Sequence, residues 1–183
     1  MVESKQKFEF FSGNPIKQER GDCVLRAFTK MEEKEKTYED VYKEMKKVSP
    51  DGDKNKHFYQ NIFNIMRYAK ELGYIIYDLN GKYKYKSHYK LSTVRRVAEA
   101  SEIMGIDMMC ITNNHAIACS EGKYHDTWDS GGKRVGYILI KDTENKLKDI
   151  IHRIDEGKVV FEKKGKRVII TDIPQEKELL KFD

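Results

Sequence analysis

Cys23 stands where the local sequence favours thiol chemistry. Apolar residues follow it at the spacing of one helix face, at Val24, Ala27, Phe28 and Met31. Asp22 is a residue type that caps helices and Gly21 lets the chain turn into one, so we expect a helix to begin at Cys23. A thiolate at a helix start is stabilised by the helix dipole and by backbone N–H groups without partners. Cys23 is therefore a candidate nucleophile, although a lone cysteine in a helix is also commonly a small core residue.

A second segment supplies the acid–base partners that a cysteine nucleophile needs. His115 and Asp126 lie on either side of Glu121-Gly122, which fits a two-residue hairpin turn. In that register His115 lies opposite Trp128, and Ile117 lies opposite Asp126. Residues directly opposite share a face of the sheet, as do residues two apart along a strand. We therefore expect His115, Asp126 and Trp128 to project to the same side.

That face would combine a base, a carboxylate and an indole. A carboxylate that accepts the imidazole N–H orients the ring and stabilises its charged form, while the other ring nitrogen takes the thiol proton. Asp126 has this role if the turn has two residues, whereas a three-residue loop would put Asp129 there instead. A core histidine with two solvated aspartates is the alternative interpretation of the same residues.

The patterns around these residues predict an α+β fold, with helices first and strands second. We expect helices over 23–31, 38–48, 57–72 and 91–104, which end at turn residues or at glycine. Short strands are expected near Phe8 to Phe11 and over 74–79, and four more over 108–112, 115–120, 123–130 and 134–140 read as an antiparallel meander. Cys23 would then meet His115 where the helical half joins the sheet.

The C-terminal part reads as a separate unit. A helix is expected over 143–155, followed by a hairpin that joins 159–161 to 168–170. We therefore divide the chain into a domain over 1–142 and an extension over 143–183 that packs on it.

Composition narrows the class of protein. The 183 residues are 39% hydrophobic and 36% charged, with a net charge of +5 that does not by itself imply nucleic acid. No run of about 18 apolar residues and no apolar signal region is present, so we expect a soluble, cytoplasmic protein without a membrane partner. Three cysteines without framework spacing fit a reducing compartment. No feature predicts an oligomeric state.

Two further patterns carry weaker signals. Lysines alternate with tyrosines over 82–90, and basic charge beside stacking rings is how single-stranded nucleic acid is bound, so Lys82 and Lys84 are candidate binding residues. The same alternation describes an edge strand with outward lysines that prevent aggregation, which we favour. The remaining cysteines and two histidines are zinc-binding residue types, but no Cys-x-x-Cys pair occurs, and we expect no metal and no other cofactor. These are Cys110, Cys119, His88 and His125.

The order of cysteine, histidine and Asx resembles the papain-like cysteine peptidases. Asp126-Thr127-Trp128 is similar to the Asn-Ser-Trp of that superfamily, in which the amide orients the histidine and the indole covers their hydrogen bond. The stretches over 21–27 and 122–130, together with His115, are similar to a group of small phage and bacterial proteins regarded as papain-like. The match covers two short motifs and their order along the chain.

This resemblance implies a papain-like fold and a thiol hydrolase that cleaves a peptide or isopeptide amide. Cys23 would be the nucleophile, His115 the base and Asp126 its orienting group, with Trp128 lining the binding site. The superfamily usually carries a glutamine six residues before the cysteine as an oxyanion donor, and here Gln18 is five before. Gln18 is therefore a candidate only, and the backbone N–H of Cys23 is the other donor.

The resemblance does not fix the reaction. The Cys-Gly-Ser-Cys-Trp surround of papain is absent, so its peptide specificity does not transfer. Deamidases, acyl-transferases and cell-wall endopeptidases share the same chemistry. The alternative from a different class is a catalytically silent papain-like module that binds a host protein or nucleic acid.

Overall fold

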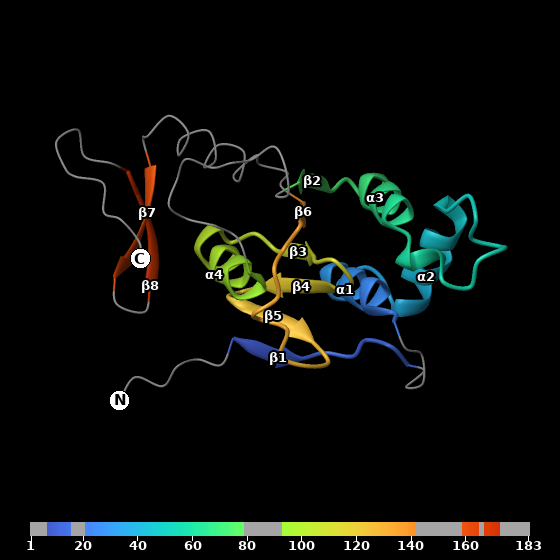
Figure 1. Cartoon of the computed structure of the whole chain (residues 1–183), viewed down its shortest axis with the longest axis horizontal. Coiled ribbons are helices and arrows are strands. Elements are labelled where there is room, and N and C mark those ends of the chain that lie inside the picture. Colours follow the sequence, from blue (N-terminus) through green and yellow to red (C-terminus); the bar gives the residue numbers. More distant parts are fainter. Residues whose placement is uncertain (1–6, 16–20, 79–92, 142–158, 165–166, 173–183) are drawn as a thin grey trace.

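The computed structural model describes residues 7–15, 21–78, 93–141, 159–164 and 167–172 (Figure 1). Its helices are α1 (Cys23–Met31), α2 (Tyr38–Val48), α3 (Ile62–Glu71) and α4 (Val94–Met104), with a 3-10 turn η1 (Phe58–Gln60) before α3. Its strands are β1 (Phe8–Phe10), β2 (Ile75–Asp78), β3 (Met108–Ile111), β4 (Ala116–Ser120), β5 (Lys123–Asp126), β6 (Tyr137–Ile140), β7 (Val159–Lys164) and β8 (Arg167–Asp172). These helices and the mixed sheet that the strands form are consistent with the predicted α+β class.

Six strands form one mixed sheet in the order β1-β5-β4-β3-β6-β2. The pairs β3–β4, β4–β5, β3–β6 and β2–β6 are antiparallel, and β1 runs parallel to β5 at one edge. The predicted four-strand meander is therefore wrong at its last strand. A meander would place β6 beside β5, whereas β6 pairs with β3. Both sides of β3 are consequently covered by strands, and all four of its residues are buried.

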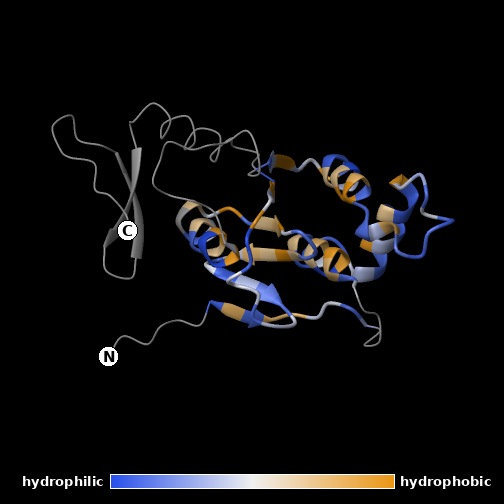
Figure 2. Ribbon diagram, viewed as in Figure 1, coloured by the Kyte–Doolittle hydropathy of each residue, from blue (hydrophilic) through white to orange (hydrophobic). Residues whose placement is uncertain are grey.

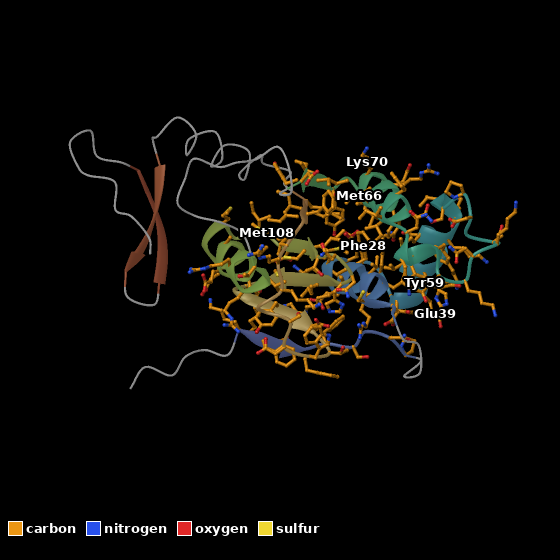
Figure 3. All side chains as sticks on the ribbon, viewed as in Figure 1. Phe28, Glu39, Tyr59, Met66, Lys70 and Met108 are labelled. Atoms are coloured by element: carbon orange, nitrogen blue, oxygen red, sulfur yellow. The ribbon has the colours of Figure 1, made fainter. Side chains whose placement is uncertain are left out.

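The two faces of the sheet carry separate cores. One cluster joins α4 to Met108, Cys110 and Ile117, and the other joins α1, α2 and α3 to the alternate residues Met109 and Ile111. Period-two alternation along β3 sends successive side chains to opposite faces. Figure 3 labels Phe28 and Met108, one from each cluster. The sheet is thus the middle layer. Cys23 lies at the N-terminal end of α1, which covers one face of the sheet.

Most helix boundaries follow the predictions. The capping box between Thr37 and Asp40 is present at the start of α2. The third helix starts later than predicted, at Ile62, because the side chain of Asn61 accepts a hydrogen bond from the N–H of Phe63 and caps it there, while 58–60 form the 3-10 turn. In the part of the chain that the structure describes, no helix is long and apolar enough to cross a membrane.

The predicted C-terminal hairpin is confirmed and forms its own sheet. β7 and β8 pair antiparallel from Val159 opposite Asp172 to Lys164 opposite Arg167. They do not join the six-stranded sheet. The helix expected over 143–155 lies outside the described residues, and the division at residue 142 stays a prediction.

Candidate active site

The cysteine helix begins where the sequence predicts, but its entry is built differently. α1 starts at Cys23, which is half-buried, and Asp22 occupies the N-cap position. The Asp22 side chain makes no capping hydrogen bond, contrary to the prediction. Its carboxylate instead accepts bonds from Asn14 at 2.5 Å and Tyr38 at 3.1 Å, and pairs with Arg26 at 3.2 Å. Asp22 therefore fixes the start of α1 through Asn14 and Tyr38 from other segments and through Arg26 one turn along α1.

The hairpin that carries the histidine has the predicted register. Glu121 and Gly122 have φ angles of +50° and +80°, as a two-residue turn of the type I′ class requires. Ser120 pairs with Lys123, and Ala118 pairs with His125. Extending this register by one residue places Ile117 opposite Asp126, as predicted. β5 is buried over Tyr124 to Asp126 although its residues are hydrophilic (Figure 2), which marks this strand as a site of polar chemistry.

The histidine and Asp126 form a direct pair. His115 Nε2 lies 2.6 Å from Asp126 Oδ2, and the two side chains are only 10% and 3% exposed. The Cys23 side chain lies near the same imidazole and contributes to raising the pKa of His115. Because Nε2 is engaged by the carboxylate, Nδ1 is the ring nitrogen available to the thiol. The structure thus brings together Cys23 at the start of α1, His115 before β4 and Asp126 at the end of β5.

The charge state of the imidazole follows from these contacts. Burial opposes a charge on His115, but the hydrogen bond with Asp126 and the interaction with nearby Cys23 outweigh it and raise the pKa of His115 from 6.5 to about 9. The ring is therefore positively charged at neutral pH.

Asp126 is held as a carboxylate by its neighbours. Burial alone would raise its pKa, but the bond with His115 reverses this, and the pKa of Asp126 lies below its ordinary value. The buried Ser130 hydroxyl lies near the carboxylate and contributes to this effect without full hydrogen-bonding geometry. The backbone N–H of Thr127 donates to Asp126 Oδ1 at 2.7 Å. Both oxygens of the carboxylate are thus engaged, one by the imidazole and one by the backbone.

The indole of Trp128 covers the imidazole. The two ring centroids lie 5.4 Å apart with the planes tilted by 35°. Lys133 Nζ lies 5.2 Å from the centroid of the indole, within cation–π range. Trp128 is 46% exposed, so one side of it is available to a bound molecule.

No protein-family model, curated protein or solved structure matches this chain.

Asp129 does not reach the histidine. Its carboxylate accepts the hydroxyl of Tyr124 at 2.5 Å and the N–H of Gly131 at 3.1 Å. Asp129 thus accepts hydrogen bonds within its own turn and from β5. Asp126 is consequently the carboxylate that the fold sets beside His115.

Other candidates from the sequence are placed elsewhere or lie beyond the described ranges. Gln18, Lys82 and Lys84 lie outside the described residues. Cys110 and Cys119 are buried between β3, β4 and α4, with their sulfurs 3.7 Å apart. The described part of the chain contains no group of three or more His, Cys, Asp or Glu residues that could hold a metal ion.

Sequence reasoning missed the polar residues that surround the site. Arg26 pairs with Asp22 one helical turn earlier. The i,i+4 spacing of these opposite charges is a local pattern from which the pair could have been predicted. The contact between Arg26 and Thr127 spans about a hundred residues of sequence, and no local pattern predicts it.

Cys23 should be alkylated by iodoacetamide before Cys110 and Cys119. Both of the others are fully buried, so accessibility alone gives this order. Activation by the imidazolium is tested by comparing the rate constant at Cys23 with that in His115→Gln, where we expect a loss of about tenfold or more at neutral pH. Peptide mapping by mass spectrometry measures both rates. Equal rates in the two proteins would mean that Cys23 is exposed but not activated.

Proposed function

We propose that this protein is a thiol hydrolase that cleaves a peptide or isopeptide amide with Cys23, His115 and Asp126, on a papain-like arrangement of a cysteine helix against a sheet. The observation that carries the proposal is the 2.6 Å contact between His115 and Asp126, on an imidazole that also lies near Cys23. A nucleophile, a base and a group that orients the base are the minimum set for covalent acyl transfer.

The reaction starts from the charged pair of thiolate and imidazolium. The Cys23 sulfur attacks the substrate carbonyl carbon, and the carbonyl oxygen takes up the negative charge. His115 then gives its proton to the amine as the C–N bond breaks, which leaves a thioester on Cys23. Neutral His115 takes a proton from water, the resulting hydroxide attacks the thioester, and the carboxylic acid is released with the thiolate restored. Asp126 keeps the imidazole in the orientation that serves both proton transfers.

The negative charge on the carbonyl oxygen needs hydrogen-bond donors. The backbone N–H of Cys23 lies at the N-terminal end of α1, where the helix dipole also favours an anion. Gln18 remains the proposed side-chain donor. Trp128 and its exposed side are proposed to contact the substrate chain beside the scissile bond.

A reducing compartment suits this chemistry. All three cysteines are free, and the nucleophile works only as a thiol or thiolate. We therefore propose that the protein acts on a peptide or protein in the cytoplasm.

Hydrolysis of amides should depend on Cys23. Denatured protein and isopeptide-linked substrates are incubated with the wild type and with Cys23→Ala, and new amino groups are quantified and located by mass spectrometry. We expect cleavage by the wild type and only background from the variant, because the other two thiols, Cys110 and Cys119, are buried. Equal cleavage by both proteins would reject the proposal, and specific binding without cleavage would favour the silent binding module.

The pH profile should report His115. A folded pKa of about 9, above the ordinary 6.5, means that the imidazolium needed for proton donation is present at neutral pH and is lost as pH rises through about 9. We expect kcat/KM to fall on the alkaline side near that pH. In Asp126→Asn the fall should move toward neutral pH, because the carboxylate that favours the charged ring is gone. An alkaline limb unchanged by Asp126→Asn would contradict the assignment of that limb to His115.

A further inference from the structure

We propose that Arg26 is a positioning residue that aligns Asp126 on His115 by tying together the two sides of the site, an inference that rests on the proposed function. Arg26 Nη1 donates to Thr127 Oγ1 at 3.1 Å, and Arg26 Nε lies 3.2 Å from Asp22 Oδ1. Asp22 immediately precedes Cys23, and Thr127 immediately follows Asp126. One guanidinium therefore connects the neighbour of the nucleophile to the neighbour of the carboxylate.

The connection is anchored at the helix side. Asp22 is 2% exposed and also accepts bonds from Asn14 and Tyr38, so it cannot follow a moving arginine. The Arg26 side chain is itself only 16% exposed. A buried pair with additional hydrogen bonds keeps a defined geometry, unlike an exposed ion pair that solvent screens.

The connection reaches the carboxylate through the backbone. The N–H of Thr127 donates to Asp126 Oδ1 at 2.7 Å, while Asp126 Oδ2 is the oxygen that contacts His115. The position of Thr127 therefore sets the plane of the carboxylate. A shift of Thr127 would turn Oδ2 away from Nε2, and the imidazole would lose its orientation toward Cys23.

The contacts close a ring around the site. It runs from His115, which lies near Cys23, to Asp126 and Thr127, and returns through Arg26 and Asp22 by two side-chain contacts and the peptide bond to Cys23. Arginine suits the returning step because its planar group presents separate N–H donors to two acceptors at fixed angles. Lysine has a single point charge on a flexible stem and cannot hold Thr127 and Asp22 at fixed angles in the same way.

The test substitutes Thr127, because a single group of this side chain can be removed or kept without a large change in its size. Thr127→Val keeps the shape and removes the hydroxyl, whereas Thr127→Ser keeps the hydroxyl. The probes are turnover of p-nitrophenyl acetate and the downfield proton resonance of His115 Nε2–H in NMR spectra. We expect Thr127→Val to lower kcat by about tenfold with KM nearly unchanged and to move or broaden that resonance, because small misplacements of a catalytic group cost rate rather than binding. Thr127→Ser should behave like the wild type.

Arg26→Met should reproduce the effects of Thr127→Val, and Lys30→Met is the matched control. Lys30 lies one turn further along α1 and pairs with Glu33 at 2.7 Å, away from the site. If Arg26→Met fails to fold, the two Thr127 variants still decide the question. The inference is wrong if Thr127→Val keeps both the wild-type kcat and the wild-type resonance, or if Thr127→Ser loses them equally. Because the resonance reports the His115–Asp126 contact directly, it tests the positioning role even if the wild type turns over no ester and the proposed hydrolase function fails.

Discussion

Replacing His115 with glutamine is expected to lower the turnover of an activated ester by about 10⁴-fold or more, with the fold kept. The glutamine amide can fill most of the space of the imidazole and donate a hydrogen bond to Asp126. It cannot accept the thiol proton or return one to a leaving group, so both halves of the reaction lose their acid–base catalyst. Steady-state release of p-nitrophenolate measures the effect, and circular dichroism checks the fold.

Cys23→Ala supplies the matched comparison for this variant. Residues that act as one unit have strongly non-additive effects, so adding His115→Gln to Cys23→Ala should cause almost no further loss. Additive losses would mean that the histidine promotes hydrolysis without Cys23. If His115→Gln retains more than about a tenth of wild-type turnover, His115 takes no part in the proton transfers.

Asp126→Ala is expected to reduce turnover by about 10² to 10⁴, the range typical of a lost acid–base contribution. The alanine leaves the His115 ring without the partner at 2.6 Å that orients it and favours its charged form. Turnover of the same ester provides the measurement. Asp126→Asn should lose less, since an amide oxygen can still accept the imidazole N–H.

Asp129→Ala provides the control three residues along the chain. Its contacts are hydrogen bonds with Tyr124 and Gly131 and an ion pair with Arg95 at 4.0 Å, so its loss should cost about 1 kcal/mol in the free energy of unfolding and leave turnover within a small factor of wild type. Urea titration and the ester assay separate the two effects. A folded Asp129→Ala without activity, beside an active Asp126→Ala, would overturn the choice of the orienting carboxylate.

Local rules were sufficient to predict much of this site. The start of α1 at Cys23 follows from apolar spacing, and the placement of Asp126 beside His115 follows from a two-residue turn at Glu121-Gly122 and the alternation of strands. Both arguments act over short stretches of chain, where backbone geometry restricts the outcome strongly. The capping box at Thr37 belongs to the same class.

Long-range features could not be predicted from the same patterns. The return of β6 to β3 depends on which strand edge is free once the hairpin has formed, and alternation along 134–140 is the same for either neighbour. Asp22 looked like a helix cap because its residue type is common there, yet Arg26, Asn14 and Tyr38 compete successfully for its oxygens. The contacts with Asn14 and Tyr38 bring residues from other segments onto Asp22 and depend on tertiary packing.

The most direct test of the account is whether Cys23 is acylated during turnover. Wild-type protein is mixed with p-nitrophenyl acetate, quenched at short times and digested, and the acetylated residues are identified by mass spectrometry. We expect a rapid release of p-nitrophenolate, close to one equivalent per protein, together with an acetyl thioester on Cys23 that decays as turnover proceeds. That adduct should be nearly absent in His115→Gln. Acetylation of Cys23 at the same rate in wild type and His115→Gln, or no acetyl group on Cys23 while the ester is consumed, would contradict the account.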